Sequence, residues 1–178
     1  MSQIPPLPGA NVRSNSYFVA RTSVPCRHCG LATRLLALAL PQDHEILDED
    51  AEDQDEGRAE RPAEAWQRAG VNAFLFYVER LPGQVRDRLN LLSRLFRPAH
   101  SAATLNTYWT NHCAHCGRPL DDHELHCEPG AFMASSEAAA AAIELIRIPE
   151  PFAAVAAGYA MEPEFFACMR ESCRVRES

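Results

Sequence analysis

The sequence contains no lysine, and its charge balance is acidic rather than basic. All seventeen basic residues are arginines, and 24 acidic residues bring the formal net charge to −7. A protein that binds nucleic acid through its phosphates needs a basic surface, so this balance disfavours nucleic acid as a partner. The absence of lysine, together with the abundant alanine, is typical of proteins encoded in GC-rich bacterial genomes.

Long apolar runs are also missing. No uninterrupted stretch approaches the roughly 18 apolar residues that a membrane-spanning helix needs. The first sixteen residues lack the charged start and the apolar core of a signal peptide. We therefore expect a cytoplasmic protein that does not engage a membrane. In that compartment seven cysteines, an odd number, indicate metal binding or redox chemistry rather than a disulfide framework.

The acidity is concentrated in one segment. Residues 43–64 contain eleven acidic residues and two arginines, so the rest of the chain has a slightly positive balance. Like charges repel one another, and this segment has no apolar periodicity, which together predict a mobile acidic loop. A solvated loop is the simpler interpretation, and an acidic docking segment for a basic partner is the alternative.

Four of the cysteines belong to two copies of one motif, Cys-x-His-Cys-Gly, at residues 26–30 and 113–117. A CxxC turn can direct two sulfurs at one ion, and a glycine just after it accepts the positive φ that such a turn needs. Two turns supply four thiolates, which fill a tetrahedral site and leave no open position. The motifs therefore predict one structural zinc per chain, with the ligands Cys26, Cys29, Cys113 and Cys116.

Redox chemistry is the main alternative for these cysteines. A thioredoxin-like mechanism uses a single CxxC at the N-terminus of a helix. Here the motif is doubled and each copy is expected to be a turn beside a strand, which favours a pair acting on one metal. His28, His112 and His115 lie within or beside the motifs. His28 and His115, which precede the second cysteine of each motif, offer substitute ligands, but we expect them to be exposed.

The segment DDHELHC, residues 121–127, offers ligands for a second metal site. On a helix, His123 and His126 would share a face and, with Cys127 or an aspartate, could form a catalytic metal site with an open position. The segment is short and ends near Pro129, so we expect a turn or strand, in which the two histidines face opposite sides. The alternative role is a loop that supports the zinc turn through hydrogen bonds.

Apolar patterning predicts the main elements. Strands are expected at residues 16–24, 31–40 and 74–78, and helices at 84–97 and 137–148. The resulting fold class is α+β: a split zinc ribbon in which two β-knuckles share one zinc, with a long helix-containing insert and C-terminal helices. We expect residues 1–15 to be a flexible arm, 16–160 a single zinc-ribbon-like domain that includes the acidic loop 43–64, and 161–178 a C-terminal tail or short helix.

Two blocks of sequence resemble a family of small uncharacterised bacterial proteins with two CxxCG knuckles. They are SYFVARTSVPCRHCGLATRLLALALP and YWTNHCAHCGRPLDDHELHCEPGAF, roughly residues 16–41 and 107–132. The sequence departs from the family pattern at Arg27, where an aromatic residue is expected, at Asp121, where glycine is expected, and at Cys127, a variable position. The resemblance implies a zinc-ribbon-like fold with a structural zinc, and it implies no activity.

These patterns favour a binding protein over an enzyme. We expect a zinc-stabilised protein-interaction module whose partner is a protein, contacted through the aromatic strand or the acidic loop. One alternative is a nucleic-acid-binding zinc ribbon that uses the arginine-bearing helix 84–97, although the overall charge disfavours it. The other is a metal-dependent hydrolase that uses His123 and His126.

Overall fold

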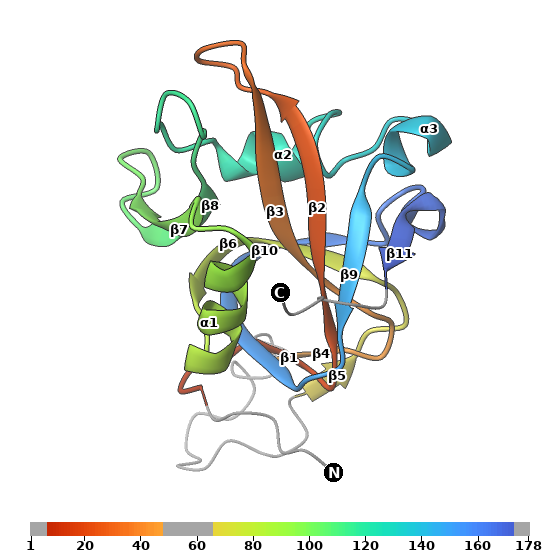
Figure 1. Ribbon diagram of the computed structural model, residues 1–178. Helices are drawn as coiled ribbons and strands as arrows, with labels where there is room; N and C mark the ends of the chain where they lie inside the picture. Colours follow the sequence, from red (N-terminus) through yellow and green to blue (C-terminus); the bar gives the residue numbers. More distant parts are fainter. Residues whose placement is uncertain (1–6, 48–65, 173–178) are drawn as a thin grey trace.

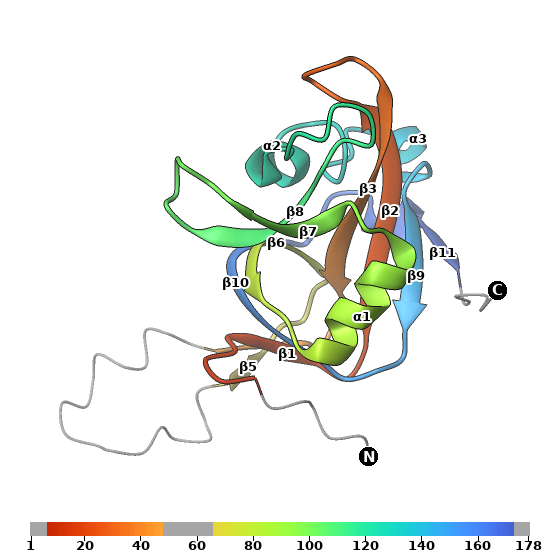
Figure 2. The same cartoon turned by 60° about the vertical axis from the view of Figure 1, so that its left-hand side comes forward.

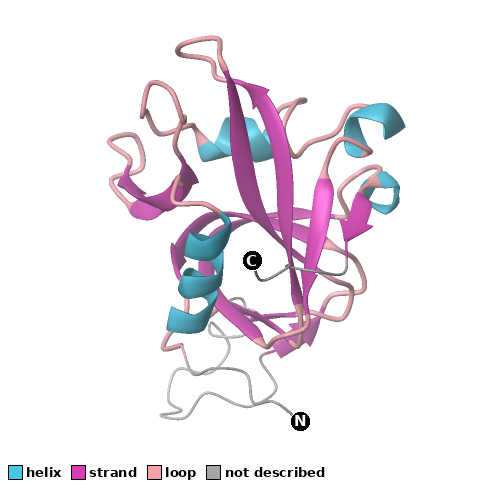
Figure 3. Cartoon of the chain, viewed as in Figure 1, coloured by secondary structure: helices cyan, strands magenta, loops and turns pink. Residues whose placement is uncertain are grey.

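The protein is built mainly of β-strands (Figures 1 and 3). The computed structural model describes residues 7–47 and 66–172. Within them, eleven strands form one sheet, in the order β11-β9-β2-β3-β6-β10-β1-β4-β5, and β8 joins β6 to β7. All neighbouring strands are antiparallel except β9 and β11. The strands are β1 (Val12–Ser14), β2 (Tyr17–Pro25), β3 (Ala32–Leu40), β4 (Glu45–Leu47), β5 (Trp66–Arg68), β6 (Ala73–Arg80), β7 (Phe96–His100), β8 (Thr107–Asn111), β9 (Glu144–Ile148), β10 (Phe152–Met161) and β11 (Arg170–Ser172).

Helices contribute little to the described part of the chain. They are α1 (Gly83–Leu92), α2 (Asp122–Cys127), α3 (Glu137–Ala140) and the 3₁₀ turn η3 (Phe166–Cys168). No helix within residues 7–47 and 66–172 combines the length and the apolar character needed to cross a bilayer.

The predicted α+β zinc ribbon with a helix-containing insert is wrong. The chain between the two cysteine motifs is part of the sheet itself, because β6 lies between β3 and β10 and also contacts β8. The strands predicted around residues 16–24, 31–40 and 74–78 do form, as β2, β3 and β6. Their pairing partners lie far away in the sequence, so local patterns could not reveal that one sheet joins them.

Both long helices of the prediction are also corrected. The helix expected at 84–97 ends at Leu92, and the chain turns into strand β7 at Phe96. The helix expected at 137–148 is a single turn, capped by the Ser136 hydroxyl, which accepts a hydrogen bond from the Ala139 N–H at 3.2 Å. The residues that follow, Glu144–Ile148, include two isoleucines and pair with β2 as strand β9.

The ends of the chain and the acidic segment are described only in part. Residues 1–6, 48–65 and 173–178, which include most of the predicted acidic loop, lie outside the described residues. Within the predicted arm 1–15, Val12–Ser14 form β1 between β10 and β4, and Val12 is fully buried. In the segment predicted as a tail or short helix, 161–178, the chain makes the η3 turn and then strand β11 beside β9.

Apolar side chains cover both faces of the central strands. Along β2, Tyr17 and Val19 belong to one hydrophobic cluster, whereas Phe18 and Ala20 belong to another. Strand β3 alternates in the same way, which explains its nearly continuous run of leucine and alanine. The first cluster includes Val85 and Leu89 of α1, and the second includes Leu125 of α2 and two of the motif cysteines.

The β2–β3 hairpin sets the long dimension of the molecule. Its turn, which carries the first cysteine motif, projects away from β1, β4 and β5 (Figures 1 and 2). Each strand of the hairpin has nine residues, which corresponds to roughly 27 Å of length. The cysteine motif and the short strands β1, β4 and β5 are therefore at opposite ends of the protein.

Two asparagine side chains take the place of a neighbouring strand. The side chain of buried Asn111 accepts a hydrogen bond from the Leu36 N–H and donates one to the Leu36 carbonyl, both at 2.8 Å. Asn11 does the same for Ala156, with distances of 2.8 and 3.0 Å. Each amide thus satisfies both backbone groups of one residue at a strand edge.

We predict that Asn111→Ala lowers the free energy of unfolding by about 2–4 kcal/mol, because the N–H and the carbonyl of Leu36 would be left buried without partners. Urea or thermal denaturation measures this loss. The matched control is Asn106→Ala, which removes an exposed amide that donates to Glu79 at 3.3 Å. Equal losses in the two variants would contradict the structural role of Asn111.

Candidate metal centre

The four motif cysteines come together at the projecting end of the β2–β3 hairpin. Their sulfur atoms all lie within 4.8 Å of one another, with 3.9 Å between Cys26 and Cys116 and 3.7 Å between Cys29 and Cys113. Tetrahedral coordination with metal–sulfur bonds near 2.3 Å separates sulfurs by about 3.8 Å. Within the described ranges, this is the one group of three or more ligand residues whose donor atoms lie so close.

The two turns that carry the cysteines have the same hydrogen bonds. In the first, the Cys26 N–H donates to the Leu31 carbonyl and the Gly30 N–H to the Cys26 carbonyl, at 2.8 and 2.7 Å. In the second, Cys113 and Gly117 make the equivalent bonds at 2.9 and 3.0 Å. Gly30 and Gly117 have φ values of 75° and 70°, as the motif predicts. Other residues would be strained there, although a Cβ would meet no atom within 4 Å.

Protein contacts hold the second turn against the first. The Ala114 N–H donates to the Thr33 hydroxyl at 3.1 Å, and the His115 ring lies 3.0 Å from the Ala32 carbonyl. Arg27 of the first turn forms an ion pair with Glu124 of α2. The two halves of the cluster are thus aligned by the hairpin, by the turn after β8 and by α2.

The electrostatics of the four thiols suit a bound cation. The N–H groups of Cys116 and His115 lower the pKa of Cys113 to about 6, so its sulfur is a thiolate at neutral pH. The Leu31 N–H lowers the pKa of Cys29, but desolvation and the neighbouring thiols outweigh this effect and raise that pKa to about 11. Four thiolates this close repel one another, and a divalent cation is the group that would stabilise them together.

The histidines near the motifs are not part of the cluster. His28 and His115 are exposed, as predicted. His112 is buried, with its Nδ1 3.2 Å from the Leu95 carbonyl and 3.3 Å from the Thr110 carbonyl. Desolvation lowers the pKa of His112.

The segment DDHELHC is a helix, α2, and not the predicted turn or strand. The Asp121 carboxylate caps it by accepting hydrogen bonds from the N–H groups of His123 and Glu124 at 2.9 and 3.2 Å. His126 is buried and His123 is exposed, so the structure does not bring the two histidines together. The signal overlooked in the sequence is the spacing of Asp121 and Glu124, which resembles a capping box.

Helix α2 instead buries an aspartate and a histidine beside β6. The Asp122 carboxylate accepts a hydrogen bond from the Tyr77 N–H at 2.6 Å, and Tyr77 has a left-handed φ of 51° within the strand. The His126 ring is stacked between Phe76 and Phe132, with centroid distances of 5.6 and 5.1 Å. Its Nε2 lies 3.9 Å from the nearer Asp122 oxygen, and its buried Nδ1 has no hydrogen-bond partner.

Burial shifts both members of this pair toward their neutral forms. Desolvation raises the pKa of Asp122 to about 7, against the opposing effect of the Tyr77 N–H. Desolvation also lowers the pKa of His126 to about 3. In weakly acidic solution the folded protein therefore holds a protonated Asp122 next to a neutral His126.

Comparison of the chain with protein-family models, with curated proteins and with solved structures gave no match. The resemblance seen in the sequence therefore leads to no family assignment. The clustered cysteines agree with its two-knuckle pattern and support a metal-binding site.

We predict about one metal ion per chain in the purified protein, and near-complete loss of it in Cys113→Ser, because the remaining three thiolates cannot close a tetrahedral site. Elemental analysis of the native protein measures the metal and identifies it. Cys168→Ser is the control, because Cys168 lies outside the cluster and should leave the metal content unchanged. Two ions per chain, or full retention in Cys113→Ser, would contradict a single four-cysteine site.

The buried pair predicts opposite pH responses in two variants. Between about pH 4 and 6.5 the folded state holds a proton on Asp122, whereas the unfolded state holds one on His126 instead, so the two contributions to stability offset each other. In the Asp122→Asn variant, His126 is the only member of the pair that still titrates. The free energy of unfolding of this variant should therefore rise relative to wild type as pH increases through this window. In the His126→Phe variant, Asp122 is the only member of the pair that still titrates. The free energy of unfolding of this variant should therefore fall relative to wild type as pH increases to about 7.

Urea denaturation at several pH values tests both variants. The comparison with wild type cancels the pH dependence of the cysteine site, which all three proteins share. Parallel pH profiles for the two variants would show that the pair is not neutral in the folded protein.

Proposed function

We propose that the protein is a zinc-clamped binding module, in which the metal fixes a groove for a protein partner. The observation that carries this proposal is the cluster of four cysteine sulfurs. Four thiolates are a donor set typical of structural zinc, and they leave no coordination position for a substrate or water. Such a site stabilises a surface rather than performing a reaction.

The surface that a bound zinc ion would stabilise is a groove beside the first cysteine turn. It has a volume of about 390 Å³. Three separate segments line it: the first turn with Arg27 and His28, the β7–β8 hairpin with His100 and Tyr108, and the chain after the second turn with Asp121. The first segment carries two of the four cysteines, and the third follows the turn that carries the other two, so loss of the metal would separate two walls of the groove.

The groove and its surroundings suit a protein better than a nucleic acid. Its lining combines an arginine and two histidines with an aspartate and the Tyr108 ring, which is a mixed rather than a basic surface. Leu31, on the first cysteine turn, is 52% exposed and offers an apolar contact. A protein segment with apolar and acidic side chains matches this chemistry.

The sequence suggested two other surfaces for a protein partner, the aromatic strand and the acidic loop. In the aromatic strand β6, Phe74 and Val78 are buried, so that strand cannot present most of its side chains to a partner. The acidic loop lies outside the described residues. The hydrolase alternative lacks geometric support, since His126 lies in the core and His123 on the surface.

Co-purification followed by binding measurements with the purified partner tests this proposal. Leu31 does not line the groove itself but lies on the same cysteine turn as the lining residues Arg27 and His28. We expect Leu31→Asp to weaken binding by roughly tenfold or more, because it replaces an exposed apolar side chain on this turn by a carboxylate that repels an acidic partner. Cys113→Ser should abolish binding together with the metal. Leu91→Asp is the matched control, since Leu91 is 77% exposed on α1 and belongs neither to a cysteine turn nor to the groove lining.

Partner binding that withstands both Leu31→Asp and removal of the metal would contradict the groove. A partner that disappears on nuclease treatment and is released by moderate salt would instead identify a nucleic-acid-binding protein.

A further inference from the structure

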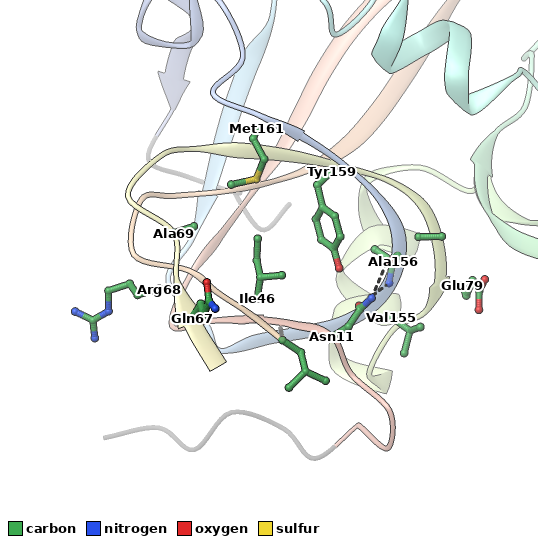
Figure 4. Close-up of a pocket in the computed structure, with 12 residues that line it drawn as sticks. Asn11, Ile46, Gln67, Arg68, Ala69, Glu79, Val155, Ala156, Tyr159 and Met161 are labelled. Carbon is green, nitrogen blue, oxygen red and sulfur yellow. Dashed lines mark hydrogen bonds between the residues drawn. The ribbon is translucent and has the colours of Figure 1, made fainter. Parts of the chain in front are cut away.

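A larger hollow lies at the opposite end of the protein from the cysteines (Figure 4). Its volume is about 790 Å³, within the range of roughly 300–1,000 Å³ that is usual for small-molecule sites. The residues that line it belong to or adjoin β1, β4, β5, β6 and β10. The cysteine turns do not contribute to its lining, so a ligand bound in this hollow would be independent of the metal and of the protein-binding groove.

The cavity forms where two parts of the sheet separate. Strand β1 pairs with β10 only over Phe152–Ala154, and the Asn11 side chain extends this contact to Ala156. From Ala157 to Met161, β10 continues along β6, whereas β1 leads across to β4 and β5. The diverging strands leave the space that Figure 4 shows between β10 and β5.

Strand register decides which side chains face the cavity. Ile46 pairs with both Val12 and Gln67, so these three residues share one face of the β1-β4-β5 ribbon. Val12 is fully buried in the core, which identifies this face as the inner one. Figure 4 shows Ile46 and the Tyr159 ring pointing into the hollow, with Gln67 beside them.

The charged residues of the lining point away from the hollow. Arg68 is opposite Glu45 on the outer face of the ribbon, and Glu79 accepts a hydrogen bond from Asn106 of the β7–β8 loop. Figure 4 shows both side chains directed outward. Among the described residues, the charged members of the lining thus offer no counter-ion inside the hollow. A charged group bound there would lose hydration without compensation from them, which is costly, so the cavity selects against charged ligands.

The remaining groups favour an aromatic ligand. The Tyr159 ring offers an aromatic face, and Ile46 and the Met161 thioether supply apolar, polarisable contacts. We propose that this cavity is a binding site for an uncharged aromatic molecule.

Calorimetric or NMR titration of the full chain with 2-naphthol and with 2-naphthoate, both at neutral pH, tests the proposal. The two probes share a ring system, but only the naphthoate is charged. We expect 2-naphthol to bind about tenfold more tightly or better, since the charged probe must be desolvated without a partner. Absence of 2-naphthol binding, or equal binding of the two probes, would overturn the proposal.

Two variants locate the bound probe. Ala69→Phe fills the cavity from the β5 side and should weaken the binding of 2-naphthol by roughly tenfold or more. Ala138→Phe, at an exposed position of α3 that lines neither the cavity nor the groove, should leave that affinity unchanged. Met161→Arg, at a position that is 42% exposed, adds a cation at the rim and should shift the preference toward 2-naphthoate without requiring any change in the core.

Binding that is unchanged in both Ala69→Phe and Met161→Arg would place the probe elsewhere and overturn the assignment. Leu31→Asp should leave 2-naphthol affinity unchanged, because Leu31 belongs to the other end of the protein. The proposal for the cavity and the proposal for the protein-binding groove can therefore be tested independently of each other.

Discussion

Mutual repulsion among four closely spaced sulfurs is the constraint on which the cysteine-bearing end of this structure depends. The sulfurs come from two turns that are more than eighty residues apart, and the sheet brings them within 4.8 Å of one another. Thiolates at that spacing are stable together only around a cation. The entropy lost in closing so long a loop grows only slowly with its length, so one ion can stabilise a connection of this size. The position of α2, which directly follows the second turn, depends on the same contact.

A second connection runs from α2 to the centre of the sheet. Asp122 binds the Tyr77 N–H at the position where β6 departs from regular strand geometry. The opposing residues of β10 are also out of simple register there, with a shift between Val155 and Ala156. A left-handed tyrosine in a strand costs free energy, and the buried carboxyl group stabilises the N–H that this conformation turns out of the ladder. The cysteine turns and the sheet are thus joined twice, through sulfur and through a buried side chain.

The parts of the structure that the sequence predicts are those with local causes. The paired CxxCG turns, their glycines and the strands that flank the first turn are consequences of spacing and composition. The helix predicted at 137–148 is wrong because five consecutive alanines favour a helix, while the isoleucines after them pair with β2, a strand more than a hundred residues earlier. Neither the protein-binding groove nor the cavity at the opposite end could be predicted from the sequence, because each is formed by segments that meet only after the sheet has assembled. The strand predicted at residues 31–40 is confirmed as β3 (Ala32–Leu40), and burial of both faces from Leu35 to Leu40 explains its continuous apolar run.

The two asparagines also bear on how the sheet accommodates strands that diverge from one another. Backbone N–H and carbonyl groups that are buried without partners destabilise a fold, so a strand that extends beyond its neighbour needs other partners there. Asn111 engages both backbone groups of Leu36, and Asn11 engages both of Ala156. Leu36 and Ala156 are buried residues of the interior strands β3 and β10, at positions that the paired residues of the next strand do not reach. One side chain at each position completes the hydrogen bonding of the backbone, so the sheet can divide without leaving buried polar groups unpaired.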